Sequence, residues 1–400
     1  MSFRTLDTAD VAGKRVLVRV DFNVPMAGGA VSDDTRLRAA APTISRLRGA
    51  RAKVILLSHF DRPKGRRVAS MSLAPVAAPL SRIIGAPVAF VDDCIGPAAE
   101  AAISGMKDGE VVLLENLRFH AGEEANDPGF AKALASLGDL YVDDAFSAAH
   151  RAHASTEALA HLLPAFAGEA MERELQALEL ALGSPARPVM GVVGGSKVST
   201  KLELLRHLVG KLDRLAIGGG MANTFLFAQG VEVGASYCEK ELAGTARAVI
   251  ALAASQGCEL LLPLDTVVAE RAAPGVAART RPLGEIDDDE RILDAGPLTI
   301  ERLEGAMARS RTLVWNGPLG VFETPPFDRG TCQAARRAAA LVKEGKLVAV
   351  AGGGDTVAAL KHAGVAENFT FVSTAGGAFL EWLEGKTLPG VRALEGGAAA

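Results

Sequence analysis

Arginine side chains follow several apolar runs in the first half of the sequence. Arg62 comes shortly after KVILLS, Arg118 after VVLLE and Arg151 after LYVDD, while Arg36 stands at the start of the first helical pattern. In open α/β sheets, ligands bind in the crevice beyond the carboxyl ends of the strands, so residues at these places can converge on one ligand. Guanidinium groups make paired hydrogen bonds to phosphate and carboxylate oxygens. The pattern therefore predicts a site for a multiply charged anion.

Other polar side chains that could complete this site follow the same apolar runs. Asp21 and Asn23 come after RVLVRV, and His59 comes directly after KVILLS. A carboxylate and an amide at this edge of a sheet can hydrogen-bond a substrate hydroxyl. One arginine beyond a strand is usually a solvated surface residue, but the same feature at four separate places favours a binding site.

The second half of the sequence has glycine-rich turns where the first half has arginines. They occur in the segments GVVGGSKVSTK, AIGGGMAN, WNGPLGVFE, AGGGDT and STAGGA. Glycine lets backbone N–H groups approach a phosphate closely, and the N-terminus of a following helix adds a favourable dipole. One such turn is common for packing reasons alone, but five in one half indicate a phosphate site. Neither the Walker nor the Rossmann glycine spacing is present, so the nucleotide site is of another kind.

Two lysines accompany the first of these turns. Lys197 and Lys201 stand four residues apart at the start of a helical pattern, which puts both ammonium groups on one face. A helix face with two lysines is usually just solvated. Next to paired glycines, however, it favours contact with phosphates.

Carboxylates accompany two of the later turns. Asp355 follows Gly353 and Gly354, and it could hold Mg²⁺ through oxygen, with Thr356 capping the next helix. The alternative is a plain acidic residue at a helix N-terminus. Glu323, which follows WNGPLGVF, is either a ligand-binding residue or a surface carboxylate.

The elements that must position these residues form an alternating pattern of short apolar runs and amphipathic stretches. In the first helical stretch, for example, Leu37, Ile44 and Leu47 recur at helical spacing. The alternation predicts an α/β fold with two doubly wound parallel-sheet, Rossmann-like domains that face each other across a cleft. We expect domains over 1–165 (with a C-terminal segment of about 390–400) and 186–389, joined by a connecting segment over 166–185 that holds one long helix, from about Phe166 to Leu182.

Composition narrows the function further. Across 400 residues, 43 Lys and Arg against 47 Asp and Glu leave a net charge of −4, so no general field attracts nucleic acid or anionic lipid. The start of the chain lacks a basic and apolar leader, and no stretch is apolar for long enough to span a membrane, so we expect a cytoplasmic protein. The four cysteines form no CxxC pair and are expected to be buried small hydrophobes, not a zinc site or a redox pair.

Taken together, the motifs resemble those of the phosphoglycerate kinase family along nearly the whole chain. The segments that carry the resemblance are RVDFNVP, SHFDRPKG, LLENLRFHAGEE, AHRAHAST, GGSKVSTK, GGGMANTFL, LVWNGPLGVFE, GGGDT and STAGGAFLEWLEGKTLPG. They occur in the family's order.

The resemblance implies reversible phosphoryl transfer between ATP and the carboxylate of 3-phosphoglycerate, which gives ADP and 1,3-bisphosphoglycerate. It implies that the first domain binds 3-phosphoglycerate through Asp21, Asn23, Arg36, His59, Arg62, Arg118 and Arg151. It implies that Lys201, Glu323, Gly353, Gly354, Asp355 and Thr356 bind the nucleotide, with Asp355 on the Mg²⁺. Arg36, Lys197 and Lys201 would be the catalytic cations. The family also implies hinge bending, a role in glycolysis, a monomer, and a terminal segment that returns to the first domain.

A few positions depart from the family pattern. Asp143 stands where the family has Asn, and Asp61 and Ala375 stand where it has Gly. If the family glycines have positive φ, the last two substitutions strain the backbone near a substrate or hinge loop.

The expected chemistry needs no general base. A carboxylate acceptor with a reference pKa of about 4 is already an ionised nucleophile at neutral pH.

The alternatives to this function are a non-catalytic nucleotide-binding scaffold of the same fold and a nicotinamide-dependent dehydrogenase. A scaffold would be expected to lack Arg36, Lys197, Lys201 or Asp355, and all four are present. A dehydrogenase would carry GxGxxG followed by an acidic residue, and neither half does.

Overall fold

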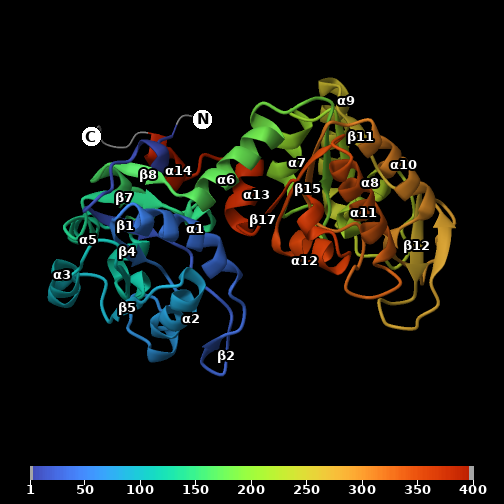
Figure 1. Ribbon diagram of the computed structural model, residues 1–400. Helices are drawn as coiled ribbons and strands as arrows, with labels where there is room; N and C mark the ends of the chain where they lie inside the picture. The colour runs from blue at the N-terminus through green and yellow to red at the C-terminus, as the bar shows by residue number, and fades with distance from the viewer. Residues whose placement is uncertain (1–2, 396–400) are drawn as a thin grey trace. The chain divides into compact units, whose positions relative to one another are not determined.

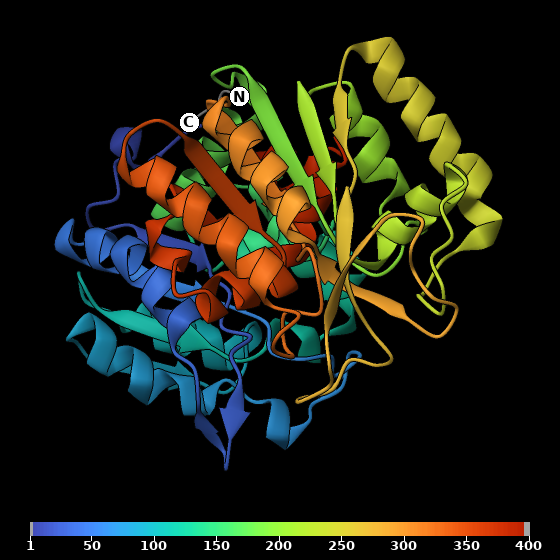
Figure 2. The same ribbon diagram turned by 90° about the vertical axis from the view of Figure 1, so that its right-hand side faces the viewer.

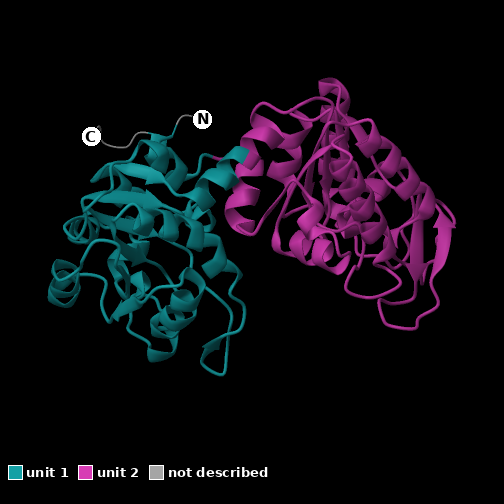
Figure 3. Cartoon of the chain, in the orientation of Figure 1, with its two compact units in different colours: residues 1–176, 387–400 teal, residues 177–386 magenta. Residues whose placement is uncertain are grey.

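The computed structural model describes residues 3–395, which form two compact units (Figure 3). Unit 1 takes the chain up to Gln176 and again from Thr387, and unit 2 runs Ala177–Lys386. No helix among the described residues is both long enough and apolar enough to cross a lipid bilayer.

Unit 1 contains a six-stranded parallel sheet with the order β5-β6-β4-β1-β7-β8 (Figure 1). Its strands are β1 (Arg15–Arg19), β4 (Lys53–Leu57), β5 (Val88–Val91), β6 (Val111–Leu114), β7 (Leu140–Asp143) and β8 (Ala165–Ala167). The central strand β1 pairs Val16 with Val54 of β4 and with Leu140 of β7. Five of these strands match predicted apolar runs, and β8 was not predicted.

Helices cover this sheet because their apolar positions recur at helical spacing. The α-helices are α1 (Thr35–Gly49), α2 (Ala74–Ile84), α3 (Gly96–Ser104), α4 (Ala121–Glu124), α5 (Pro128–Ala135) and the terminal α14 (Pro389–Glu395). In α1, Leu37, Ile44 and Leu47 are buried in the core. Short pieces complete the unit: the hairpin β2 (Met26–Ala27) and β3 (Ala30–Val31), the 3₁₀ turns η1 (Leu6–Thr8), η2 (Ala69–Met71), η3 (Leu117–Phe119), η4 (Phe146–Ala148) and η6 (Leu159–His161), and the π-helical turn η5 (Ala154–Ala158).

The segment between the units is helical over a shorter range than its sequence pattern indicates. Helix α6 runs Glu169–Leu178 and continues as a π-helical turn, η7 (Glu179–Gly183). It does not begin near Phe166, because that residue lies in β8 and pairs with Val142 of β7. The N–H of Glu169 donates to the hydroxyl of Thr43, and the carboxylate of Asp144 accepts from the N–H groups of Ala170 and Met171, so these bonds fix where the helix starts.

Unit 2 contains a second six-stranded parallel sheet, ordered β11-β10-β9-β15-β16-β17. Its strands are β9 (Val189–Val193), β10 (Arg214–Ile217), β11 (Glu259–Leu261), β15 (Thr312–Asn316), β16 (Val348–Gly352) and β17 (Phe371–Ser373). All six coincide with predicted apolar runs. The expected α/β class with two parallel sheets is therefore confirmed.

The helices of unit 2 pack on this sheet, and a small antiparallel sheet adjoins it. The helices are α7 (Leu202–Val209), α8 (Gly219–Ala228), α9 (Ala243–Gln256), α10 (Pro297–Ala308), α11 (Arg329–Lys343), α12 (Gly354–His362) and α13 (Gly376–Leu383), with 3₁₀ turns η8 (Lys240–Leu242) and η9 (Ala366–Asn368). Helices α10 and α11 lie side by side (Figure 2) and share a core with β9, β15 and β16. The antiparallel sheet, β13-β12-β14, consists of β12 (Asp265–Ala269), β13 (Arg279–Pro282) and β14 (Arg291–Ala295), and it was not predicted.

Candidate functional site

In unit 1, the loop after β1 and the first turn of α1 bring three of the predicted residues together. The Nη1 of Arg36 donates to the backbone oxygen of Asn23 at 2.7 Å and to Oδ1 of Asp21 at 3.1 Å. The other oxygen of Asp21 accepts a hydrogen bond from the hydroxyl of Ser147, which follows β7. Two strand ends and a helix start therefore fix the Arg36 guanidinium, as the strand-end argument predicts.

The backbone of Asp61 links this group to Arg118. The N–H of Asp61 donates to Oδ1 of Asn23 at 2.9 Å, and its carbonyl oxygen accepts from Nη1 of Arg118 at 2.8 Å. Asp61 has a φ of 53°, in the left-handed region that favours glycine, whereas Ala375 has a φ of −91°. Of the two substitutions of family glycines, only Asp61 therefore stands in the strained conformation, and Asp is among the side chains that tolerate it best.

His59 lies buried at the centre of the positive charges. Its Nδ1 is 3.0 Å from Nη2 of Arg19. Because a guanidinium can only donate, Nδ1 is the acceptor and the proton of the neutral ring sits on Nε2. Burial holds the pKa of His59 well below its usual range, and the charges of Arg19, Arg118, Arg36 and Arg151 lower it further. The ring stays neutral, and the four arginines that act on it form one cluster of cations.

Arg19 is a site residue that the sequence interpretation missed. Its side chain is fully buried, and its Nε donates to Oγ of Ser155 at 2.8 Å. Ser155, in the π-helical turn η5, in turn donates to Oε1 of the buried Glu123 at 2.6 Å. An arginine inside the apolar run RVLVRV was the available signal, because a charge in a buried strand needs a specific partner.

The remaining predicted cations of unit 1 are less constrained. Arg151 is half-buried, and its Nε donates to Nε2 of His150 at 3.2 Å. Arg62 is exposed on the loop after β4, and within residues 3–395 no hydrogen bond or ion pair joins it to the cluster.

In unit 2, the turns after β9 and β15 meet around Lys201. Its Nζ donates to the backbone oxygen of Gly194 at 2.5 Å and to Oδ1 of Asn316 at 2.6 Å. The two turns approach each other closely. A Cβ added to Gly194 would lie 1.8 Å from the backbone oxygen of Pro318, and a Cβ added to Gly317 would lie 2.2 Å from the backbone oxygen of Gly194. Glycine is required at both places for this contact. Asn316 is a second residue that the sequence interpretation missed, although it is part of the WNGP segment.

Burial weakens the proton affinity of Lys201. It lowers the pKa of this lysine to about 8, and the charge of Asp355 opposes that shift only in part. The ammonium group is thus held among oxygens in a place that a further anion would stabilise. Lys197, by contrast, is exposed in the loop before α7.

The turn after β16 supplies the start of α12. Gly353, with a φ of 103°, is the residue before the helix, and Gly354 and Asp355 open the first turn as exposed residues. Thr356 was predicted to cap α12, and this prediction is wrong, because among the described residues no side chain makes a capping hydrogen bond there. Its hydroxyl donates to the backbone oxygen of Gly352 at 2.8 Å and accepts from the N–H of Gly317 at 2.7 Å, so it joins the turns after β15 and β16.

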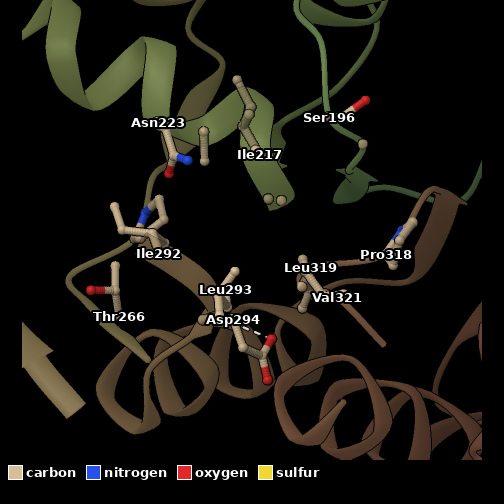
Figure 4. A pocket seen from close by; sticks show the side chains of 18 of the residues that line it. Ser196, Ile217, Asn223, Thr266, Ile292, Leu293, Asp294, Pro318, Leu319 and Val321 are labelled. Atoms are coloured by element: carbon tan, nitrogen blue, oxygen red, sulfur yellow. Dashed lines mark hydrogen bonds between the residues drawn. The ribbon is translucent and has the colours of Figure 1, made fainter. Parts of the chain in front are cut away.

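A cavity of about 340 Å³ adjoins these turns. Its walls are largely apolar, and Ile217, Ile292, Leu319 and Val321 lie around it (Figure 4). Glu323 and Asp355 also line it, together with the glycines at the start of α8. An apolar slot with a few polar groups at its edge is the usual form of a small-molecule site. The sequence interpretation did not identify the apolar walls.

The carboxylate of Asp355 fits a magnesium ion that is shared with a polyphosphate. Mg²⁺ takes oxygen ligands and is usually held by one or two carboxylates, with water and substrate phosphates completing its shell. Asp355 is exposed at the N-terminus of α12 and close enough to Lys201 to influence its pKa. Its position therefore provides one oxygen ligand and leaves room for the others.

The chain is similar to known proteins along nearly its whole length. A family model described as phosphoglycerate kinase matches residues 6–386. The phosphoglycerate kinase of Caulobacter vibrioides (strain NA1000 / CB15N) is 69% identical over 395 residues, which cover 99% of this chain and 100% of the relative. That of Zymomonas mobilis subsp. mobilis is 60% identical over 396 residues, which cover 99% and 100%.

Solved structures agree with these sequence relatives. Phosphoglycerate kinase from Coxiella burnetii matches with a TM-score of 0.92 at 40% identity, over 98% of this chain and 99% of that one. The enzyme from Pyrococcus horikoshii OT3 matches with a TM-score of 0.79 at 30% identity, over 98% of each chain. With sequence and fold both matched end to end, the chain belongs to the phosphoglycerate kinase family.

Proposed function

We propose that the chain transfers a phosphoryl group between MgATP and the carboxylate of 3-phosphoglycerate, with the acceptor held by unit 1 and the nucleotide by unit 2. Phosphoglycerate kinase activity itself follows from the family. The proposal adds which side chains perform it. It also includes the family's setting, a cytoplasmic monomer that acts in glycolysis.

The observation that carries the acceptor site is the cluster of guanidinium groups around a neutral His59. In this proposal, Arg36, Arg62, Arg118 and Arg151 pair with the phosphate and carboxylate oxygens of 3-phosphoglycerate. His59 contributes a neutral Nε2–H donor. Asp21 and Asn23 bind the substrate hydroxyl. Among residues 3–395, only Asp21 on Arg36 and Glu124 on Arg118 are acidic side chains in contact with these four arginines, so an anion of high charge suits them.

For the nucleotide, the apolar cavity of unit 2 suits a purine base, and Glu323 at its edge suits the ribose hydroxyls. The phosphates would then extend toward Lys201 and the N-terminus of α12, where Gly353, Gly354 and Thr356 line the turn. Backbone N–H groups at a helix start favour phosphate oxygens. The lowered pKa of Lys201 supports this assignment, because a nearby polyphosphate would raise that pKa back toward its ordinary value.

Catalysis in this proposal consists of positioning and charge neutralisation. The acceptor carboxylate is ionised at neutral pH, so no side chain has to remove a proton. Arg36 and Lys197 flank the transferring phosphoryl group, Lys201 binds the nucleotide phosphates, and Asp355 orients the metal-bound nucleotide. Mg²⁺, when bound with the nucleotide, neutralises phosphate charge. Because the two sets of residues belong to different units, in-line transfer requires hinge bending that unites them and excludes water.

The direct test measures ADP formation from ATP and 3-phosphoglycerate in a coupled assay, with and without Mg²⁺. Arg36→Ala should lower kcat by about 100-fold or more, as expected when an electrostatic donor to a transition state is lost. Arg38→Ala is the matched control, because Arg38 lies on the same helix, is largely exposed and pairs with Asp34. Equal turnover in the two variants would remove Arg36 from its proposed role, and no ADP under either condition would support the scaffold alternative.

A further inference from the structure

Three potential metal ligands, two of them from the start of α11 and one from the end of α12, meet on unit 2, outside the site described above. The carboxylate of Asp328, the thiol of Cys332 and the imidazole of His362 have ligand atoms that all lie within 4.8 Å of one another. Nε2 of His362 is 2.9 Å from Oδ2 of Asp328. Cys332 is buried, and the side chains of Asp328 and His362 remain 19% and 39% exposed, so an ion can reach the group from solvent.

The elements that hold these ligands favour a fixed geometry. Asp328 immediately precedes α11 with helical backbone angles, and Cys332 lies four residues later, which puts both side chains on one face of the helix. The same spacing positions two histidines in zinc-binding helices. His362 is the last residue of α12, and it reaches across to α11.

We infer that Asp328, Cys332 and His362 form a binding site for a borderline divalent transition metal ion such as Zn²⁺. A thiolate, an imidazole and a carboxylate are the three ligand types that zinc prefers, and a water molecule completes a tetrahedron. Ligand atoms around such an ion lie roughly 3.5 Å apart, so small side-chain movements bring this group to binding distance. Binding displaces the thiol proton to solvent and shifts the ring proton of His362 from Nε2 to Nδ1 by exchange with solvent, so that two metal bonds replace the hydrogen bond between His362 and Asp328.

The site adjoins the nucleotide cavity of unit 2. The ring of Phe322 packs edge-on against that of His362, with centroids 6.4 Å apart. Glu323, the next residue, lines the cavity. A metal ion at this place would therefore restrain the segment that leads into the cavity.

A second group of the same composition lies on unit 1 and serves as an internal comparison. Asp93, Cys94 and His120 also have ligand atoms within 4.8 Å of one another. Here Oδ1 of Asp93 lies 2.7 Å from Nε2 of His120. The same oxygen already accepts a hydrogen bond from the backbone N–H of Cys94, also at 2.7 Å. A metal would have to compete with that bond, so we assign the binding to the group on unit 2.

The experiment titrates the full, chelator-treated chain with Co²⁺ as a spectroscopic probe, in excess Mg²⁺ to occupy sites made of oxygen alone. We expect one equivalent of Co²⁺ to produce a thiolate-to-metal charge-transfer band and the strong visible bands of a four-coordinate ion, and Zn²⁺ to abolish both. Cys332→Ser should remove the thiolate band. His362→Gln should weaken Co²⁺ binding by at least roughly tenfold, since even the loss of an outer-shell partner has that effect.

Cys94→Ser is the matched control and should bind Co²⁺ as the unmodified chain does. Circular dichroism checks that each variant is folded, and the exposed His362 provides a test even if Cys332→Ser does not fold. The inference is overturned if the unmodified chain shows no thiolate band, if the band survives in Cys332→Ser or if His362→Gln binds Co²⁺ normally. Loss of the band in Cys94→Ser would move the site to unit 1 and equally overturn it.

Discussion

Lys201 shows how a single side chain can be prepared for a ligand. Its ammonium group is surrounded by the oxygens of Gly194 and Asn316, yet burial still lowers its pKa to about 8. Protein oxygens alone therefore do not offset the loss of water around the charge. The negative charge of a bound polyphosphate would offset that loss. The binding free energy of such a ligand depends on Lys201 being protonated.

This gives a pH prediction for the nucleotide. The kcat/KM for MgADP should fall as pH rises through about 8, because the free enzyme loses the Lys201 proton there instead of near its ordinary value of 10.5. Lys201→Arg, which stays charged, should shift that fall to higher pH, and Lys201→Met should be weak at every pH. Initial-rate measurements across the range test this, and an unmodified enzyme whose profile stays flat well above pH 8 would contradict it.

Asp143 is a buried carboxylate where the family has Asn. It accepts a hydrogen bond from the N–H of Ala145 at 3.0 Å, but burial raises its pKa to about 6. A raised pKa means that the residue favours the folded state fully at acid pH, below its unfolded value of 3.8, and that this advantage is lost as pH rises through about 6.

Asp143→Asn should therefore stabilise unit 1 above pH 6 but not at low pH. The difference in unfolding free energy between variant and original should grow by roughly 3 kcal/mol between acid pH and pH 8, from the size of the pKa shift, and roughly half of that change falls between pH 5 and pH 8. Urea unfolding of both chains at pH about 5 and about 8 measures it. A difference that does not change with pH would show that folding does not raise the pKa of Asp143.

At the scale of elements, side chains hold together the glycine-rich turns that follow β15 and β16 in unit 2. Thr356 is 2% exposed, and its hydroxyl joins Gly317 after β15 to Gly352 at the end of β16. Asn316 makes a parallel link, because its Nδ2 donates to the same Gly352 oxygen at 2.8 Å. The start of α12 is thus fixed by contacts from a neighbouring strand.

Thr356→Val should disturb this arrangement with little change in shape. The substitution leaves the buried N–H of Gly317 without an acceptor, which should cost about 1–3 kcal/mol of stability and raise the KM for the nucleotide. Thr356→Ser keeps the hydroxyl and serves as the control. Denaturant unfolding and nucleotide KM measure the two effects, and equal behaviour of the two variants would mean that the link has no role.

Sequence patterns predicted most strands but not all the elements. Short apolar runs bounded by polar or glycine residues identified β1, β4, β5, β6, β7 and all six strands of the second parallel sheet, because strands of a parallel sheet covered by helices are mostly apolar. β8 is only three residues long, and its extended form depends on pairing with β7. The strand β13 is polar and mostly exposed, and in β12 and β14 polar residues interrupt the apolar ones, so no long apolar run marks these three strands.

The residues of the candidate site likewise fall into those that the sequence could predict and those that it could not. Residues that follow strand ends, such as Arg36, Arg118 and Lys201, could be predicted because topology alone brings strand ends together. The partners of Arg19 and the apolar cavity could not, since each depends on which side chains face inward after packing, although an arginine inside RVLVRV was a signal in itself. The Asp328, Cys332 and His362 group is a third such case, because its ligands come from two helices and no cysteine spacing indicates it.

At the scale of the whole molecule, the chain enters unit 2 once and then returns. Helix α14 belongs to unit 1, where the N–H of Gly390 donates to the backbone oxygen of Ala149 at 2.9 Å. Val391 and Leu394 are buried against the elements that follow β7, including the π-helical turn η5. That turn carries Ser155, the partner of Arg19, so α14 packs against an element that holds the arginine cluster around His59.

Leu394→Ala should therefore weaken unit 1 and leave unit 2 unaffected. Removal of a fully buried leucine side chain costs roughly 2–5 kcal/mol. Hydrogen exchange followed by mass spectrometry should show faster exchange in residues 146–161, with unchanged exchange in the strands of unit 2. Arg392→Ala, an exposed change on the same helix, is the control. Equal protection of residues 146–161 in both variants would show that α14 does not support them.

The return of the chain through α14 also sets an order of events during synthesis. A ribosome makes the strands of unit 1 first, but it releases their last supporting helix only after every residue of unit 2 has been made. Unit 2 is thus the first to have all of its own residues, although N-terminal domains are usually complete first. Until α14 has been synthesised, the apolar surface of unit 1 that Val391 and Leu394 cover stays exposed to water.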